Sequence, residues 1–236
     1  MSGILFIISA PSGSGKTTLT NELLRLVPDL QFSISYTTRP PRGSERDGTE
    51  YFFVSKDDFE RMLWEGEFLE HACVFGHYYG TARRFLAEAF AQGKDLLLDI
   101  DVQGAAQVKQ KMPEAVSIFI MPPSRSILEF RLRNRSQSEH VEDEEVIRRR
   151  LDGARKEIEN YRNYDYILVN DDLQKSIPQL KAVVSAERAR RSGGNAAVDR
   201  SILEAAQQCM RENVCPRADE ILRSFREGSQ APVRGE

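Results

Sequence analysis

The chain has 236 residues, of which 40% are hydrophobic and 29% are charged, and its formal net charge is −3. That length suffices for one sizeable α/β domain with insertions, and the near-neutral charge gives no broad basic field that would attract a nucleic acid. The chain has only three cysteines, none in a C-x-x-C pair, and three histidines, which argues against a zinc site or a disulfide framework.

A phosphate-binding loop is predicted near the N-terminus. The apolar run Ile4 to Ser9 is typical of a strand, and Lys16 to Leu26 has the periodicity of an amphipathic helix. The two segments are joined by the string Ala10-Pro11-Ser12-Gly13-Ser14-Gly15-Lys16-Thr17, whose last two residues begin the helix. It matches G-x-x-x-x-G-K-[ST] except that Ala10 replaces the first glycine. Alone, the match leaves GTPases, ATPases, small-molecule kinases and an accidental Gly/Ser-rich turn open.

The physical reason for such a loop is the recognition of phosphate. Its glycines let backbone N–H groups converge on phosphate oxygens, and the helix that follows presents its positive N-terminal end. The lysine can reach the outer phosphates, and the threonine hydroxyl is placed to ligate Mg²⁺. The sequence therefore predicts a nucleotide site at Lys16 and Thr17.

A small mixed insertion is predicted from about Phe32 to Gly80. Two short alternating runs favour half-buried strands, Phe32 to Tyr36 and Tyr51 to Val54, and Gly- and Pro-bearing turns separate them. The change of pattern after Leu26 indicates that the core is interrupted here.

The core resumes with three continuous apolar runs: Asp95 to Ile100, Val116 to Met121 and Tyr166 to Val169. A helical segment separates each of the last two from the run before it. Alternating β and α segments predict a mostly parallel sheet flanked by helices, with ligands at the carboxyl ends of the strands. Three polar residues fall at such ends: Asp99, Asp101 and Asn170.

A charged segment lies between Arg125 and Lys156, with nine basic and seven acidic residues. A solvated pair of helices has the same composition. Beside a phosphate loop, its arginines also suit a mobile lid that brings guanidinium groups onto transferring phosphates: Arg131, Arg133, Arg135 and Arg148 to Arg150.

Six local strings occur in a fixed order: Ser35-Tyr36-Thr37-Thr38-Arg39-Pro40-Pro41-Arg42, Gly48-Thr49-Glu50-Tyr51-Phe52-Phe53-Val54, Gly66-Glu67-Phe68-Leu69-Glu70, Tyr78-Tyr79-Gly80-Thr81, Asp99-Ile100-Asp101-Val102-Gln103-Gly104 and Val169-Asn170-Asp171-Asp172. In order and spacing they resemble the guanylate kinases, which are P-loop nucleoside monophosphate kinases. The resemblance covers about residues 1 to 190.

The resemblance implies an acceptor site for GMP. One set of residues would hold the GMP phosphate or orient the nucleotide: Ser35, Arg39, Arg42, Tyr51 and Tyr79. A second set would read guanine: Glu70, Thr81 and Asp101. Two carboxylates suit the N1–H and amino donors of guanine and penalise adenine. Taken alone, Glu70 is typical of an exposed helix carboxylate, Asp101 of a helix cap, and the two tyrosines of buried aromatics.

The donor side follows from the loop and the resemblance together. The expected ATP-binding residues are Ala10, Pro11, Ser12, Gly13, Ser14, Gly15, Lys16, Thr17, Thr18 and Asn170. The expected catalytic residues are Lys16, Arg39, Arg131, Arg135 and Arg150. Mg²⁺ would be held by Thr17 directly and by Asp99 through water. Neighbouring basic residues allow a slip of one position, so Arg133, Arg148 and Arg149 stay open as alternatives to these arginines.

The expected fold is a P-loop NTPase-type α/β domain with a mixed insertion and a lid. Its parts are core 1–32, GMP-binding insertion 33–96, core 97–125, lid 126–150, core 151–191 and a helical extension 192–236, partly disordered. Within the extension, Ser192 to Asn195 reads as a flexible joint and Pro216 divides two helices, Ala197 to Glu212 and Arg217 to Arg226. Gly228 to Glu236 is expected to be disordered.

The extension lies beyond every motif that carries chemistry. Removing it after Arg191 is therefore expected to change turnover by less than about threefold, which is roughly 0.6 kcal/mol in the barrier. Its apolar stripe, which includes Ile202, Ala206, Cys209 and Met210, must nevertheless cover something.

The function expected from the resemblance is transfer of the γ-phosphoryl group of ATP to GMP, giving ADP and GDP, with Mg²⁺ as cofactor. Two alternatives stay open: a non-catalytic guanylate-kinase-like binding module, and a related P-loop kinase of a phosphorylated sugar. The chain has no basic signal region and no run of about 18 apolar residues. We therefore expect a cytoplasmic protein that binds neither membrane nor nucleic acid, and a homo-oligomer is left open.

Overall fold

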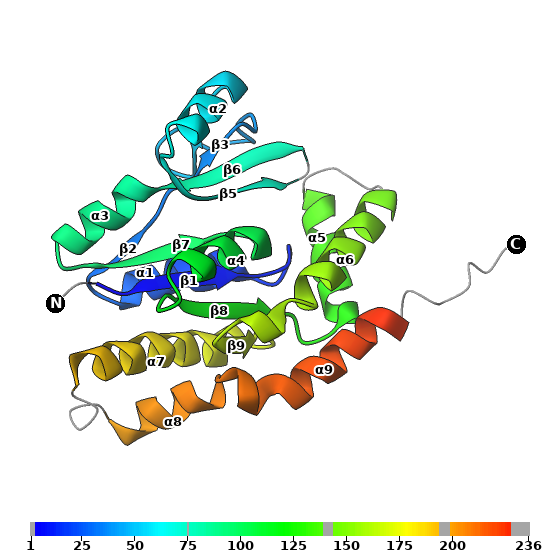
Figure 1. Ribbon diagram of the computed structural model, residues 1–236. Helices are drawn as coiled ribbons and strands as arrows, with labels where there is room; N and C mark the ends of the chain where they lie inside the picture. Colours follow the sequence, from blue (N-terminus) through cyan, green and yellow to red (C-terminus); the bar gives the residue numbers. More distant parts are fainter. Residues whose placement is uncertain (1–2, 75, 139–143, 194–198, 228–236) are drawn as a thin grey trace, which may run out of the picture. The chain divides into compact units, whose positions relative to one another are not determined.

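The computed structural model describes residues 3–74, 76–138, 144–193 and 199–227 (Figure 1). The chain forms two compact units, Met1–Ser9 with Val27–Ser117 and Ala10–Leu26 with Ile118–Glu236. Both contain parallel strands and helices, which confirms the predicted α/β fold with a parallel sheet flanked by helices. In the described part of the chain, no helix combines the length and the apolar character that crossing a bilayer requires.

The first unit contains three parallel strands: β1 (Leu5–Ser9), β2 (Leu30–Phe32) and β7 (Asp95–Asp99). β7 pairs with both of the others. All five residues of β1 are buried, as expected for an apolar run covered on both faces. The unit also contains α3 (Arg83–Ala91), which packs on β7, and α4 (Val102–Lys111), which contacts β1.

A second, four-stranded sheet in this unit has the order β4, β3, β6, β5. Its strands are β3 (Tyr36–Thr37), β4 (Phe52–Phe53), β5 (Phe68–Val74) and β6 (His77–Ala82). Ser55 caps the N-terminus of helix α2 (Lys56–Trp64): its hydroxyl oxygen accepts from the Asp58 amide. Buried Phe59 of α2 stacks on Phe68 at 4.5 Å between ring centroids, so the helix and sheet share an aromatic core.

The single strand predicted over Phe32 to Tyr36 is wrong. β2 ends at Phe32, and β3 begins only at Tyr36. Phe32 pairs with Leu97 of the parallel strands, whereas Tyr36 pairs with Gly80 of the four-stranded sheet. One alternating run therefore contributes to two sheets. The strand with which each residue pairs determines its sheet, and local periodicity does not reveal that partner.

The second unit holds helix α1 (Lys16–Leu26), most of β8 (Val116–Met121) and β9 (Tyr166–Val169). These three elements have the bounds expected from the sequence, and β8 and β9 pair in parallel. The charged segment forms α5 (Arg125–Ser138) and α6 (Glu144–Ile158), which contact each other. A short 3-10 helix, η1 (Tyr161–Asn163), and the long helix α7 (Leu173–Ser192) follow.

Two more helices end the described chain, α8 (Arg200–Gln208) and α9 (Arg211–Glu227). The prediction that Pro216 divides them is wrong, because Pro216 lies inside α9 and the break falls at Cys209 and Met210. A proline inside a helix removes one hydrogen bond. The buried face of α9, which includes Ala218 and Phe225, compensates for that loss. Of the predicted joint only Ser192 and Gly193 are described, and Gly228 to Glu236 lies outside the described residues.

Candidate functional site

The glycine loop between β1 and α1 has the backbone shape that its sequence predicts. Gly13 and Gly15 have φ angles of 88° and 85°, a region in which side chains other than glycine are strained. The Ser14 amide donates to the Pro11 carbonyl at 3.1 Å, which closes a tight turn. α1 begins at Lys16, so the N-terminus of the helix, where the first amides have no acceptor within the helix, follows the loop directly. The loop therefore has the form of an anion-binding nest.

Asn170 fixes this loop from the end of β9. Its side-chain amide donates to the Ser14 carbonyl at 2.7 Å, and Asn170 itself is buried. A Cβ at Gly15 would lie 2.4 Å from the same amide nitrogen, so only glycine fits there. Arg131 of α5 in turn donates from Nη2 to the Asn170 carbonyl at 3.0 Å. Three of the expected donor-site positions thus form one hydrogen-bonded cluster within the second unit.

The Arg131 guanidinium has N–H donors that no described residue uses. Its Nη1 is buried, with no hydrogen-bond partner among the described residues. Burial lowers the pKa of Arg131, and the charge of Asp171 acts in the opposite direction. A buried unpaired guanidinium nitrogen costs free energy unless an anion completes it. Arg131 is therefore suited to a phosphate oxygen.

The other basic residues of α5 and α6 differ from one another in their surroundings. Arg133 is held by carboxylates on both helices, Glu129 at 2.8 Å and Glu144 at 2.9 Å, so it joins α5 to α6. Arg150 is half-buried on α6, whereas Arg148 and Arg149 are exposed. The side chain of Arg135 and the residues 139–143 between the helices lie outside the described part of the structure.

In the first unit, Arg39 is buried and held on several sides. Its Nε donates to the Tyr79 hydroxyl at 3.2 Å, Nη1 to the Pro40 carbonyl at 2.8 Å and Nη2 to Glu45 at 3.0 Å. The guanidinium also lies 5.3 Å from the centre of the Tyr51 ring. A guanidinium has five N–H groups, so these bonds fix the orientation of Arg39 and leave N–H groups for an anion.

The other residues that were expected to hold the acceptor phosphate also lie in the first unit. Tyr51 and Tyr79 meet edge to face at 5.8 Å and are half-buried. Arg42 is exposed, and its amide donates to Glu45 at 2.8 Å. Ser35 accepts from the Phe52 amide through its carbonyl. Glu45, which no motif singled out, therefore organises both arginines, and no feature of its own in the sequence signals that.

Glu70 is not the exposed helix carboxylate that its local pattern suggests. It lies on β5 and is only 3% exposed. The Thr81 hydroxyl of β6 donates to Glu70 Oε1 at 2.6 Å. Because that hydroxyl proton is committed, the Thr81 oxygen can act toward a ligand only as an acceptor.

Asp101 caps α4, as its local pattern predicts. Its Oδ1 accepts from the Gly104 amide at 2.9 Å, and its Oδ2 accepts from Gln103 at 3.1 Å. A Cβ at Gly104 would lie 2.3 Å from Glu70 Oε2 and 3.4 Å from Asp101 Oδ1. The two carboxylates therefore both approach the backbone of Gly104, and the pair is preserved by the absence of a side chain there.

The ionisation of Glu70 is strongly perturbed. Burial raises the pKa of Glu70 to about 7, and the charge of Asp101 acts in the same direction. The Thr81 hydroxyl and the Lys111 ammonium oppose this shift. A buried carboxylate beside a second carboxylate is unfavourable for folding, and such groups cluster at functional sites. The carboxylates are thus suited to a ligand that brings N–H donors.

Two residues of α4 hold β5 in place, and sequence reasoning missed both. The Gln107 side chain accepts from the His71 amide at 3.3 Å and donates to the His71 carbonyl at 2.6 Å. Lys111 donates to the Leu69 carbonyl at 2.5 Å. They bond the outer backbone edge of β5 on both sides of Glu70. Neither residue is conspicuous in the sequence. On the same helix, Gly104 is conspicuous, because a glycine inside a helix normally costs stability and so points to a close contact.

Comparison with known proteins gives a consistent result. Residues 2–187 match the model of the family described as guanylate kinase. The guanylate kinase of Koribacter versatilis is 60% identical over 230 residues, covering 97% of this chain and 98% of the relative. That of Escherichia coli K12 is 50% identical over 192 residues, 80% and 91% of the two chains. The crystal structure of guanylate kinase from Anaplasma phagocytophilum matches with a TM-score of 0.66 and 34% identity, covering 87% and 96%.

Proposed function

The chain belongs to the guanylate kinase family, and we propose that it transfers the γ-phosphoryl group of ATP to GMP, giving ADP and GDP. The observation that carries the substrate is the buried carboxylate Glu70, with Thr81 and Asp101 beside it. Guanine offers N1–H and an exocyclic amino group, which match two carboxylate acceptors. Adenine offers an acceptor at N1, so the same carboxylate would repel it.

We assign the phosphate of GMP to the arginine cluster around Arg39. Its bonds to Tyr79, Pro40 and Glu45 hold the guanidinium plane before the substrate arrives. A fixed fork of N–H donors suits phosphate oxygens better than a flexible ammonium group does. Arg42, Ser35 and Tyr51 would complete the contacts of the phosphate.

On the donor side, the glycine loop would act as a phosphate loop. Its backbone amides and the start of α1 would bind the phosphates of ATP, with Lys16 reaching the γ-phosphoryl group. Arg131 would add a guanidinium whose Nη1 has capacity for an anion, and Arg150 and Arg135 are proposed to join it. The reaction needs no covalent intermediate, so positioning and charge stabilisation supply the catalysis.

The residues present fit Mg²⁺. Thr17 exposes its side chain in the first turn of α1, and Asp99 ends β7 half-buried, so each of these two expected ligands offers oxygen atoms. Among the described residues, no three His, Cys, Asp or Glu side chains gather to hold a metal ion by themselves. We propose that Mg²⁺ is also bound by the nucleotide phosphates, whose charge it would neutralise.

Two alternative functions are less well supported. A non-catalytic binding module has no need for Lys16 in the loop or for a buried arginine with spare capacity. A kinase of a phosphorylated sugar gives Glu70 no base to read, so its burial would be a cost without a use.

An assay of ADP release tests the proposal directly. With ATP and Mg²⁺, GMP is expected to be the preferred acceptor in a panel that also contains dGMP, AMP, CMP and UMP. No ADP release with any acceptor would support the binding module, and ADP release stimulated by a sugar phosphate alone would support the second alternative.

Replacing Gly104 with Ala is expected to raise KM for GMP by about tenfold or more, because the added Cβ would lie 2.3 Å from Glu70 Oε2 and displace that carboxylate. KM for ATP should change by less than twofold. Gly153→Ala is the matched control: Gly153 is also inside a helix, and nothing lies within 4 Å of its added Cβ. It should leave both constants unchanged and stabilise the protein by about 0.5–1 kcal/mol. Equal effects of the two variants on GMP would contradict the assignment.

A further inference from the structure

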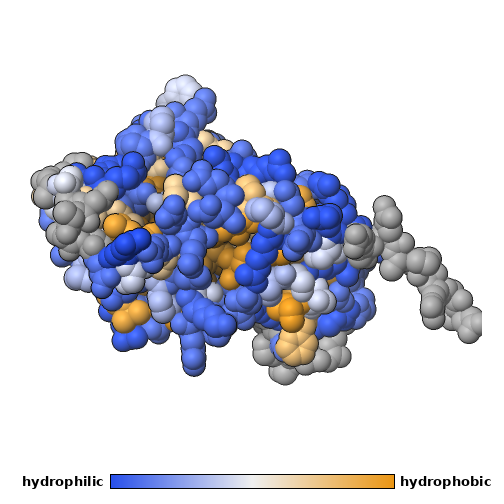
Figure 2. All heavy atoms as spheres, turned by 90° about the horizontal axis from the view of Figure 1, so that it is seen from below, coloured by the Kyte–Doolittle hydropathy of each residue, from blue (hydrophilic) through white to orange (hydrophobic). Residues whose placement is uncertain are grey.

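The C-terminal helices α8 and α9 lie beyond residues 2–187, which match the family model, yet they are packed into the second unit. α8 packs along α7, and α9 contacts α5, α6, η1 and β9 (Figure 1). The apolar residues of α9 are turned inward, including Ala218, Ile221 and Phe225. Figure 2, seen from below Figure 1, accordingly shows a face that is mostly hydrophilic with hydrophobic residues in separate patches.

Helices α5 and α6 carry the proposed phosphate arginines, and α9 contacts this pair near the start of α5 and after the end of α6. At the start of α5, the Arg125 amide donates to the Ser224 hydroxyl at 3.2 Å. Beyond the end of α6, Asp219 accepts from the Tyr161 hydroxyl at 2.7 Å and from Arg162 at 2.9 Å. One helix therefore bonds to the start of α5 and to η1, which follows α6 in the chain.

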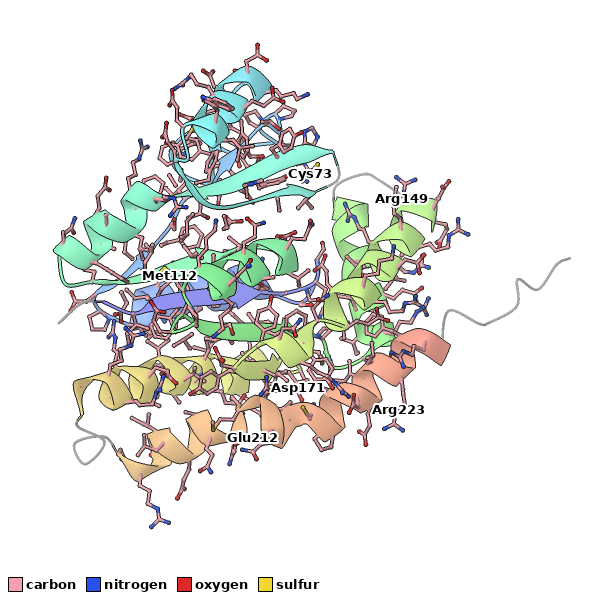
Figure 3. All side chains as sticks on the ribbon, viewed as in Figure 1. Cys73, Met112, Arg149, Asp171, Glu212 and Arg223 are labelled. Carbon is pink, nitrogen blue, oxygen red and sulfur yellow. The ribbon has the colours of Figure 1, made fainter. Side chains whose placement is uncertain are left out.

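A third contact reaches the donor site itself. Arg217 of α9 forms an ion pair with Asp171 at 2.8 Å, and Asp171 directly follows Asn170, which holds the glycine loop. Figure 3 shows Asp171 beside α9, whereas Arg223 of the same helix points away. The contact with Arg217 lowers the pKa of Asp171, so its carboxylate remains ionised.

The ion pair between Arg217 and Asp171 is too exposed to contribute much to the free energy of folding. The side chains of Arg217 and Asp171 are 53% and 44% exposed, and ion pairs at the surface contribute little to folding. Its effect on charge is more specific. The charge of Asp171 also acts on Arg131, whose Nη1 is buried without a hydrogen-bond partner among the described residues. Arg131 itself donates to the carbonyl of Asn170, the residue directly before Asp171, so the Asp171 carboxylate lies near both arginines.

We propose that Arg217 is a positioning residue for the ATP site: it holds the Asp171 carboxylate away from Arg131 and so keeps the Arg131 guanidinium available to a phosphate of ATP. Without Arg217, the Asp171 carboxylate competes with the nucleotide for Arg131. The proposal rests on the donor-site assignment made above. It gives the extension an effect on the affinity for ATP, which the absence of motifs did not suggest, and leaves the expectation for turnover unchanged.

The test uses the full-length chain. Arg217→Ala is expected to raise KM for ATP, and Kd for ATP in the absence of GMP, by about three- to tenfold. kcat and KM for GMP should change by less than twofold. Adding Asp171→Asn to this variant should return both ATP constants to within about twofold of the original, because the competing charge is gone. Arg217→Lys should lie in between, since an ammonium still attracts Asp171.

Arg223→Ala is the matched control, because Arg223 is exposed on the same helix and should change no constant. An unchanged ATP affinity in Arg217→Ala would overturn the proposal. So would an effect that Asp171→Asn does not reverse, since a general distortion of the loop would persist. ATP binding is measured by calorimetry without an acceptor, so the test remains valid even if GMP is not the substrate. Failure of the acceptor panel would contradict only the proposed function.

Discussion

Replacing Lys16 with Met is expected to lower kcat for GMP phosphorylation by about 10²–10³, while leaving the fold intact. Lys16 is the first residue of α1, and the helix has no acidic residue in its first turn. The helix dipole disfavours a cation at this end by about 0.3–1 kcal/mol. We expect the charge that develops on the transferring phosphoryl group to outweigh that cost.

Lys56→Met is the matched control, because Lys56 is also the first residue of a helix, α2, and is exposed. It should leave turnover unchanged. Initial rates with ATP and GMP varied, together with thermal unfolding of both variants, make the comparison. If Lys16→Met turned over GMP at the original rate while remaining folded, the glycine loop would not be the site of the donor phosphates.

Glu70→Gln is expected to reduce kcat/KM for GMP by about 10- to 1000-fold, with little change in the constants for ATP. A charge-assisted hydrogen bond contributes about 1.5–3 kcal/mol, and the Gln amide would also set a donor against a donor of guanine. AMP should become relatively less disfavoured, because its N1 is an acceptor. An unchanged ratio of GMP to AMP would mean that Glu70 does not read the base.

The same variant should be more stable than the original protein at alkaline pH. Because the pKa of Glu70 is raised from 4.5 to about 7 in the folded state, the folded protein holds a proton between these values that the unfolded chain has lost. Stability from this group is therefore present below pH 4.5 and is lost as the pH rises through about 7. The loss amounts to about 3 kcal/mol. Gln does not ionise and avoids it.

Denaturant titrations at pH 5 and pH 8 measure this difference. The stability of Glu70→Gln relative to the original should increase from the lower to the higher pH. Glu187→Gln is the control: Glu187 is also buried and accepts from the Tyr166 hydroxyl at 2.6 Å, but it also binds Arg190. That variant should lose stability and keep its preference for GMP. KM for GMP in the original protein should rise as the pH falls below 7, since protonation removes the charge of Glu70 and turns one of its acceptor oxygens into a donor.

Local sequence patterns predicted those elements whose signals are themselves local. α1, β8 and β9 begin and end where the apolar periodicity places them, and the Asp101 cap of α4 was also expected. Glu70 shows the limit of this approach. Its neighbours have the composition of a helix, and only pairing with β6 makes the segment a strand. The resemblance to a family, not the local pattern, indicated its importance.

Contacts between distant parts of the chain could not be predicted in the same way. Arg217 and Asp171 are 46 residues apart, and neither belongs to a pattern that requires the other. Pro216 misled the prediction for a related reason, because the cost of a proline inside a helix is outweighed by packing that the sequence does not display. Gln107 is an ordinary helix residue until the edge of β5 lies beside it.

The division of the chain into units has a consequence for its synthesis. The first unit is complete once Ser117 has been made, and only the short segment Ala10–Leu26 interrupts it. The second unit joins that early segment to residues made after Ser117, and the bond from Asn170 to Ser14 spans 156 residues. Closing so long a loop costs more entropy than closing the short one. On the ribosome, the residues proposed to recognise guanine are therefore all synthesised while the loop that would bind ATP still lacks the asparagine that shapes it.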